Sequence, residues 1–337
     1  MRIVVRADSS KTMGFGHITR SLTLARALQD AGADVVSVGQ GMREGIALSS
    51  SFQDLQIIER APSHDADEVE QILALQPDGV VTDGYHFSRN FFEQLDKASI
   101  PYAAIDDNGE TEAINPIAIH NQNPHANREL YGDFFDEPLF MLGLNFALLR
   151  PEVTKLAAKP HKKSGKIVVS LGGTDSENLT VPITSALIDS GYGVAINERF
   201  KDALNRARND VGHSDKIEFF PPQMFLKTLR SAKLAVLGAG TSLWEANALG
   251  TPAVGVIVAE NQVQPALRAV SDGYVTEMVN AITAPTKSSL VSEVIELATQ
   301  LQGEWSQKPP KRVQPDSAAK VADAMLVQLS NHLDNIR

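Results

Sequence analysis

The 337-residue sequence contains no cysteine and carries little positive charge. The absence of cysteine excludes disulfide bonds, thiolate nucleophiles and the zinc or iron–sulfur sites that need sulfur ligands. Lysine and arginine total 31 against 41 acidic residues, a net charge of −10, which argues against capture of nucleic acid or anionic lipid by an overall positive field. Apolar runs are short: the stretch 251–259 ends in Glu260-Asn261, well below the ~20 residues of a membrane-spanning helix. We therefore expect neither nucleic-acid nor membrane partners.

The N-terminal residues 2–6 form a strand-like run and not the long apolar segment of a signal peptide, so we expect a cytoplasmic protein. Hydrophobic residues make up 43% and charged residues 21%, which is typical of a folded globular chain. A chain of this length is too long for one small core and predicts about two domains.

Short β-branched runs alternate with segments of helical period, which is typical of α/β folds with parallel sheets. The basic, Pro- and Gly-containing segment 155–165 separates two such series and is read as a linker. We predict two Rossmann-like, doubly wound domains, residues 1–155 and residues 165–337, the second including two C-terminal helices. Such domains place ligands at the carboxyl ends of their strands, here in a cleft between them. The expected strands are 3–5, 35–38, 79–82, 102–105, 166–171, 193–196, 217–220, 234–237 and 253–257.

The first candidate site lies between the first strand and the first helix. Arg6, Asp8, Gly16, His17 and Arg20 gather at one glycine-containing turn. By its spacing alone the turn is also compatible with a plain strand-to-helix connection. A histidine at a helix N-terminus is kept neutral by the helix dipole and can accept a proton near pH 7, so His17 is a candidate general base.

The second candidate site is the loop Gly172-Gly173-Thr174, directly after the first strand of the second domain. Its backbone N–H groups could bind a phosphate. A plain turn with a helix N-cap at Asp175 or Ser176 is an equally good reading of the same residues.

The third candidate site is the most informative. Gly240 ends a strand, and a helix begins at Thr241-Ser242, so hydroxyls and amides meet at an anion-binding helix end. One turn later, Glu245 could accept hydrogen bonds from the two hydroxyls of a ribose. A first-turn acid favoured by the helix dipole is the alternative, and the surrounding pattern favours nucleotide binding over it.

Other polar residues give weaker signals. Asp65-Ala66-Asp67 resembles a metal motif but lies among acids at a predicted helix start, and the histidines show no paired ligand spacing, so we expect no metal. The segments 83–86 and 105–108, which include Tyr85 and Asp107, follow strands of the first domain and are candidate ligand contacts.

Taken together, these segments resemble the PseG family, the UDP-2,4-diacetamido-2,4,6-trideoxy-altrose hydrolases of pseudaminic acid biosynthesis. The opening signature is Arg6-Ala7-Asp8 with residues 13–22, and the agreement runs collinearly from about residue 3 to residue 275. The other matching segments are 83–85, 105–107, 121–123, 143–152, 171–175, 240–245 and 260–262.

The resemblance implies a GT-B-like fold and a metal-independent hydrolase without a cofactor. It implies that water attacks the anomeric carbon with His17 as the essential catalytic histidine and Tyr85 near the sugar. For the first domain we expect sugar or cleft contacts from Arg6, Asp8, Gly16, Arg20 and Asp107. For the second domain we expect UDP contacts from Gly172, Gly173, Thr174, Gly240, Thr241, Ser242, Glu245, Asn261 and Gln262.

Two other functions are compatible with the sequence. A GT-B glycosyltransferase would share the nucleotide-binding half and transfer the sugar to an acceptor. A non-catalytic nucleotide-sugar-binding protein would leave the histidine without a role. In each case the expected partner is a small UDP-sugar, and the sequence is compatible with a monomer.

Overall fold

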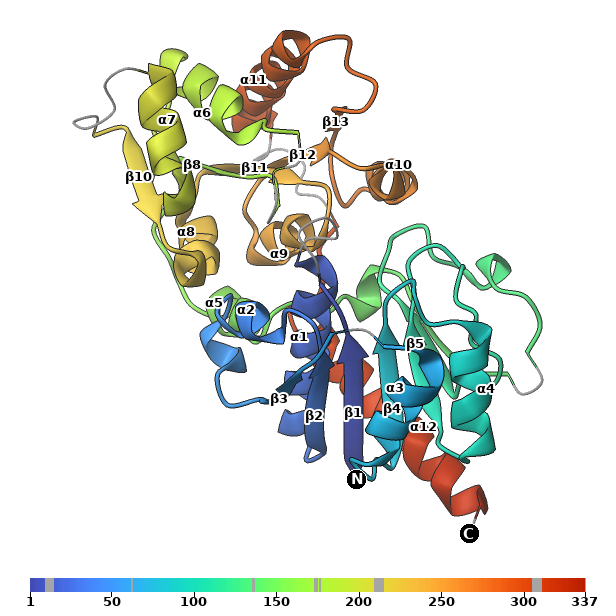
Figure 1. Ribbon diagram of the computed structural model, residues 1–337. Coiled ribbons are helices and arrows are strands. Elements are labelled where there is room, and N and C mark those ends of the chain that lie inside the picture. The colour runs from blue at the N-terminus through green and yellow to red at the C-terminus, as the bar shows by residue number, and fades with distance from the viewer. Residues whose placement is uncertain are drawn as a thin grey trace. The chain divides into compact units, whose positions relative to one another are not determined.

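The computed structural model describes residues 1–9, 15–61, 63–134, 137–172, 175, 177–208, 215–304 and 311–336. The chain forms two compact units (Figure 1). Unit 1 contains Met1–Pro151 together with Asp316–Arg337, and unit 2 contains Glu152–Pro315.

The sheet of unit 1 is parallel, with the strand order β3-β2-β1-β4-β5-β6-β7. The chain winds outward from β1 in one direction and then from β4 in the other, so the order reverses between these two strands. In such sheets the loops at the carboxyl ends of the two reversing strands diverge and leave space for ligands. The strands are β1 Arg2–Ala7, β2 Asp34–Gly39, β3 Gln56–Glu59, β4 Gly79–Asp83, β5 Tyr102–Ile105, β6 Ala118–Asn121 and β7 Leu139–Leu142.

Helices cover both faces of this sheet because alternate residues of each strand point to opposite faces. Ile3 and Val5 of β1 pack in one core cluster with Leu22 of α1, whereas Val4 packs in another with Phe91 of α4. The helices of unit 1 are α1 Gly16–Asp30, α2 Met42–Ile46, α3 Asp65–Leu73, α4 Arg89–Lys97 and α12 Ser317–Ile336.

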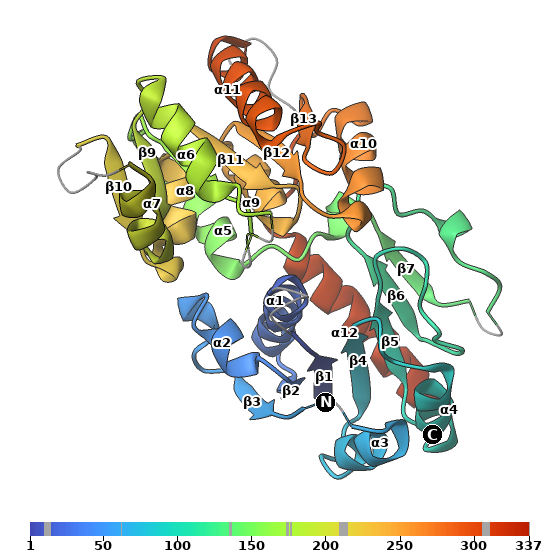
Figure 2. The same cartoon turned by 45° about the horizontal axis from the view of Figure 1, so that its top comes forward.

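The last helix, α12, belongs to unit 1, whereas the sequence analysis groups it with residues 165–337. Its buried residues Val321, Ala322, Met325 and Leu329 recur at helical spacing and join the core cluster that contains α1. Figure 2 shows α12 (red) beside the blue and green strands of this unit. An apolar stripe in a sequence indicates that one face of a helix is buried, but it does not identify the sheet that buries it.

Unit 2 repeats the same plan with six parallel strands in the order β10-β9-β8-β11-β12-β13, reversing between β8 and β11. The prediction of two Rossmann-like α/β domains is thus confirmed. The strands are β8 Ile167–Ser170, β9 Val194–Asn197, β10 Ile217–Phe220, β11 Leu234–Gly238, β12 Ala253–Ile257 and β13 Met278–Asn280. The helices are α5 Pro151–Ala157, α6 Thr180–Asp189, α7 Lys201–Arg208, α8 Phe225–Ser231, α9 Thr241–Leu249, α10 Val263–Ser271 and α11 Lys287–Glu304.

Among the residues that the structure describes, no helix combines the length and the apolar character that crossing a membrane requires.

The packing of α12 predicts that the loss of stability on truncating one of its side chains depends on whether that side chain is buried. Met325 is buried and Val327, on the opposite side of the same helix, is 61% exposed. We expect Met325→Ala to lower the free energy of unfolding by about 2–4 kcal/mol, because it leaves a cavity in the core. Val327→Ala should change it by less than about 0.5 kcal/mol. Urea denaturation of both variants measures the difference, and equal effects would contradict the packing.

A second prediction concerns His120, which is fully buried on β6 with Nε2 donating to the carbonyl oxygen of Phe146 at 2.7 Å. Burial lowers the pKa of His120 to about 4, below the ordinary value near 6.5. Between these values the unfolded chain binds a proton that the folded chain does not, so the free energy of unfolding falls as the pH drops from about 6.5 to about 4.

We expect His120→Gln to reduce this loss by about 1–3 kcal/mol in urea unfolding measured at pH 7 and pH 4.5. His64→Gln, at an exposed position of the same unit, serves as the control. An unchanged pH dependence in the His120 variant would disagree with a neutral buried imidazole.

Candidate functional site

Side chains from three strand ends meet at the switch point of unit 1. His17 and Arg20 lie on the first turns of α1, Asp83 is the last residue of β4, and Asp107 follows β5. Because β1, β4 and β5 are neighbours in a parallel sheet, their carboxyl ends lie at the same edge, and α1 begins there. The structure thus brings together residues that are up to 90 positions apart in the sequence.

Asp83 is the centre of this group and is completely buried. Arg20 clamps it with two hydrogen bonds, from Nε to Oδ2 at 2.8 Å and from Nη2 to Oδ1 at 2.6 Å, and the Ser21 hydroxyl donates to Oδ2 at 2.7 Å. Burial raises the pKa of Asp83, but the charge of Arg20 and the hydrogen bonds from Arg20 and His17 outweigh it, so the pKa lies well below its ordinary value. Asp83 is therefore ionised at neutral pH.

Arg20 also holds a second carboxylate. Its Nη1 donates to Oδ1 of Asp107 at 2.6 Å, and Asn123 Nδ2 donates to the same oxygen at 2.8 Å. Burial raises the pKa of Asp107, but Arg20 and a hydrogen bond from Tyr85 bring it down to about 2. The guanidinium of Arg20 thus links the ends of β4 and β5 to α1.

His17 pairs with Asp83 through a 2.7 Å contact between its Nδ1 and Oδ1. Nη2 of Arg20 lies 3.0 Å from the same nitrogen but carries only hydrogens to donate. The shorter distance and the negative charge favour a proton on Nδ1 that is donated to Asp83. In this tautomer Nε2 carries the lone pair, and an ionised aspartate behind the ring stabilises the imidazolium that forms when Nε2 takes a proton.

Tyr85 connects the His17–Asp83 pair to the protein surface. Its hydroxyl donates to Oδ2 of Asp107 at 2.6 Å, and its ring packs edge-on against His17 with centroids 5.0 Å apart. The residue as a whole is 51% exposed. Tyr85 is therefore positioned by the buried network and remains accessible to a ligand.

Arg6 and Asp8 have protein partners in the structure. Arg6 is buried, with Nη1 2.6 Å from Oδ1 of Asp8 and Nε bonded to Glu68. The other Asp8 oxygen lies 3.0 Å from Nε2 of His86, two residues after Gly84. Burial raises the pKa of Asp8, but hydrogen bonds from His86 and Arg6 outweigh it and lower it overall. These groups fix the loops after β1 and β4, whereas Gly16 lies exposed at the start of α1.

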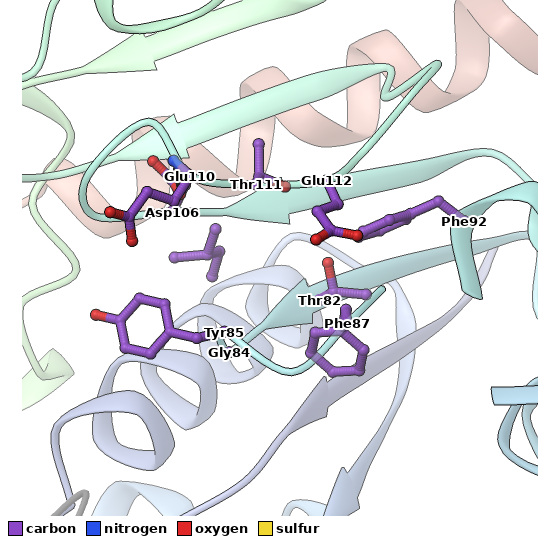
Figure 3. Close-up of a pocket in the computed structure, with 10 residues that line it drawn as sticks. Thr82, Gly84, Tyr85, Phe87, Phe92, Asp106, Glu110, Thr111 and Glu112 are labelled. Atoms are coloured by element: carbon purple, nitrogen blue, oxygen red, sulfur yellow. Dashed lines mark hydrogen bonds between the residues drawn. The ribbon is translucent and has the colours of Figure 1, made fainter. Parts of the chain in front are cut away.

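A cavity of about 140 Å³ opens beside Tyr85, within unit 1 (Figure 3). Figure 3 shows Tyr85 and Asp106 at one end and Phe92 with Glu112 at the other. Such a volume holds several water molecules or one compact polar group. The wall at Asp106 is rigid, because its carboxylate accepts from Gly109 N, Glu110 N and the Tyr131 hydroxyl. The lining residues are Thr82, Gly84, Tyr85, Phe87, Phe92, Ile105, Asp106, Glu110, Thr111 and Glu112.

In unit 2, α9 begins where the sequence predicts, directly after the glycine turn that ends β11. Gly240 is its N-cap, without a capping side chain, and Thr241 and Ser242 are half-buried at its first turn. Glu245 lies one turn further along the helix and is 1% exposed. This helix end lies at the switch point between β8 and β11, next to the loop that follows β8.

The loop after β8 has two features of a tight turn. Gly172 has φ +96° and Asp175 has φ +46°. The Asp175 carboxylate accepts from the N–H groups of Leu179 and Thr180 at 3.1 and 3.2 Å, at the start of α6. The N-cap of α6 is Leu179 and not Asp175, so the predicted N-cap position is wrong, although the Asp175 side chain does bond to the start of this helix. Gly173, Thr174 and Ser176 lie outside the described residues.

The loop after β12 carries the remaining predicted UDP contacts. Asn261 is exposed, and Gln262 accepts a hydrogen bond from the backbone N–H of Val258 through Oε1 at 2.9 Å, so it holds its own loop. Because β8, β11 and β12 are neighbours, the described UDP candidates share one edge of the unit 2 sheet. Their contact with UDP stays a prediction.

Ser21, Glu68 and Asn123 take part in these networks and were not singled out by sequence analysis. The hydroxyl directly after Arg20 and the amide in the segment 121–123 were the only signals available, and neither is specific. No cluster of three potential metal ligands occurs within the described part of the chain.

No protein-family model matches the chain. A relative in Methanocaldococcus jannaschii, an uncharacterized protein, is 24% identical over 85% of this chain, and the match spans only 61% of that relative's length. A second relative is the UDP-2,4-diacetamido-2,4,6-trideoxy-beta-L-altropyranose hydrolase of Campylobacter jejuni, 22% identical over 82% of this chain and 99% of its own.

Several solved structures have a similar fold, although their sequence identity to this chain is low. The UDP-GlcNAc 2-epimerase of M. jannaschii, in complex with UDP-GlcNAc and UDP, has a TM-score of 0.63 at 13% identity, covering 97% of this chain and 100% of its own. MurG of Acinetobacter baumannii has a TM-score of 0.59 at 15% identity, with the same coverage. These likenesses show that the chain has a GT-B-like α/β fold.

Proposed function

We propose that this protein is an enzyme that hydrolyses a UDP-linked diacetamido-trideoxy sugar and releases UDP and the free sugar for pseudaminic acid biosynthesis. The observation that carries the proposal is the His17–Asp83 pair, a histidine with its Nδ1 against a buried ionised aspartate. The hydrolase of C. jejuni, similar over most of both chains, supports the reaction class. The likeness to an epimerase bound to UDP-GlcNAc supports a UDP-sugar as the substrate class.

In the proposed reaction, Nε2 of His17 takes a proton from water while the water oxygen bonds to the anomeric carbon. The bond from that carbon to the diphosphate oxygen breaks, and UDP leaves with the electron pair. Asp83 stabilises the imidazolium, and Arg20 keeps Asp83 ionised and oriented. Tyr85, half-exposed beside the His17 ring, contacts the sugar in this assignment.

UDP binding is assigned to unit 2. In this assignment the diphosphate binds at the N-terminus of α9, where the backbone N–H groups of Thr241 and Ser242 and the helix dipole favour negative charge. The loops at Gly172 and Asn261-Gln262 complete the nucleotide contacts, and Glu245 binds the ribose. Because UDP is already a good leaving group, the protein mainly positions it and activates water.

A sugar transferase is the second candidate. It is favoured by the likeness to the solved glycosyltransferase VinC in complex with dTDP, with a TM-score of 0.57, and by the chemistry of the His17–Asp83 pair, which could equally deprotonate an acceptor hydroxyl. Incubating the purified protein with a panel of UDP-sugars, with and without acceptor alcohols, separates the two. Release of UDP and free sugar in equal amounts without acceptor is the expected result. Turnover that requires an acceptor would identify a transferase instead, and binding without any turnover would identify a binding protein.

Loss of the general base should slow turnover strongly and leave nucleotide binding nearly unchanged. We expect His17→Ala and Asp83→Asn each to slow UDP release about 10²- to 10⁴-fold, because the first removes the base and the second its orienting charge. UDP affinity should stay within about twofold of wild type, since UDP is assigned to unit 2. His64→Ala is the matched control at an exposed site. Full turnover in the His17 variant would refute the mechanism.

The ribose assignment predicts a selective loss of nucleotide affinity. We expect Glu245→Gln, which keeps the side-chain shape but removes the charge, to weaken UDP binding about tenfold by calorimetry. Glu277→Gln, at an exposed position of the same unit, should leave affinity unchanged. Equal UDP affinity in wild type and the Glu245 variant would exclude the ribose contact.

A further inference from the structure

Three cationic side chains of unit 2 converge on the turn that joins α9 to β12, residues 249–251. Arg230 donates from Nη1 to the carbonyl oxygen of Leu249, and Nζ of Lys163 lies 3.3 Å from Oγ1 of Thr251. Arg312 lies against Gly250, where an added Cβ would collide with both terminal nitrogens of its guanidinium. We call Lys163, Arg230 and Arg312 the cationic turn cluster.

Among the described residues, no acidic side chain forms an ion pair with this cluster. The ion pairs recorded for the described part of unit 2 all join other residues. The C-terminus of α9 supplies only about half a negative charge against three positive ones. Burial, and then the charges of Arg230 and Arg312, lower the pKa of Lys163 to about 8, and burial and Arg312 lower the pKa of Arg230. The three cations therefore repel one another.

Hydrogen bonds to the C-terminal end of α9 occupy only some of the donors in the cluster. Arg230 caps the last carbonyl of the helix, but its Nε is buried without a hydrogen-bond partner. Arg312 is exposed and donates no hydrogen bond to any of the described residues, whereas the partly buried Nζ of Lys163 donates to the carbonyl oxygen of Arg230 and to Oγ1 of Thr251, both at 3.3 Å. The Arg312 guanidinium thus remains available on one side of the turn, next to two further cations, in a protein whose net charge is −10.

We propose that the cationic turn cluster is an oxyanion site that binds a phosphoryl group. Guanidinium and ammonium donors suit phosphate oxygens, and one bound dianion would offset most of the repulsion. The turn precedes β12, at the amino-terminal edge of the sheet, whereas the predicted UDP loops follow the strands. A five-residue strand separates the two edges by about 16 Å, so this is a second anion site within unit 2.

Titration of the full chain with inorganic phosphate, at ionic strength held constant with chloride, tests the proposal by calorimetry. We expect Arg312→Gln and Lys163→Gln each to weaken phosphate binding about tenfold. Lys227→Gln removes the same charge from an exposed position on α8, the helix that carries Arg230, and should stay within about twofold of wild type. The absence of phosphate binding to wild type, or an equal loss in the Lys227 variant, would overturn the site.

The phosphoryl group could belong to a soluble compound or to a lipid headgroup, and sedimentation with vesicles distinguishes the two. Vesicles of phosphatidylglycerol and phosphatidylcholine in equal amounts are compared with phosphatidylcholine alone. Phosphate binding without sedimentation identifies a soluble ligand. Sedimentation that is lost in Arg312→Gln identifies a headgroup. Sedimentation that is equal in wild type and all variants, with phosphate affinity also equal, would overturn the proposal.

Discussion

The arrangement of unit 1 depends on one guanidinium that bridges two buried carboxylates. Asp83 and Asp107 end neighbouring strands, and both are buried, so without a cation between them one would have to take up a proton. Arg20 supplies that cation from the helix that follows β1 and fixes three chain segments at once. With two carboxylates and one guanidinium the cluster retains a negative charge, and Asp83 holds the imidazole of His17 at the edge of that cluster.

Sequence patterns predicted the parts of the fold that depend on local periodicity. Alternating β-branched runs and helical segments were enough to predict two Rossmann-like units, and strand ends such as Asp83 and Asp107 fell where the topology collects ligand groups. Local periodicity could not predict the partners of the charged residues in the loops after the strands. Arg6, Asp8 and Arg20 look the same in a sequence whether they face a ligand or each other. Only the tertiary fold brings Arg6 to Glu68 on α3, and Asp8 to His86 in the loop after β4.

In unit 2, prediction from the sequence was limited for a different reason. The predicted anion loops rely on backbone N–H groups, which every residue has, so their sequence signal is the glycine that permits the turn and the hydroxyl that follows it. Such a signal locates a loop without identifying its ligand. Asp175, directly after the predicted phosphate loop, illustrates this, because its carboxylate accepts hydrogen bonds from two backbone N–H groups at the start of α6. Side-chain donors give a more specific signal, as the cationic turn cluster does at the opposite edge of the same sheet.

The position of α12 has a consequence for the order in which the protein is built. Unit 2 is inserted between the body of unit 1 and the helix that completes its core, so the chain passes from one unit to the other twice. During synthesis the seven strands of unit 1 emerge first, with one face of their sheet only partly covered. That face stays exposed until the whole of unit 2 has been made, and translation therefore presents an apolar surface that chaperones would recognise.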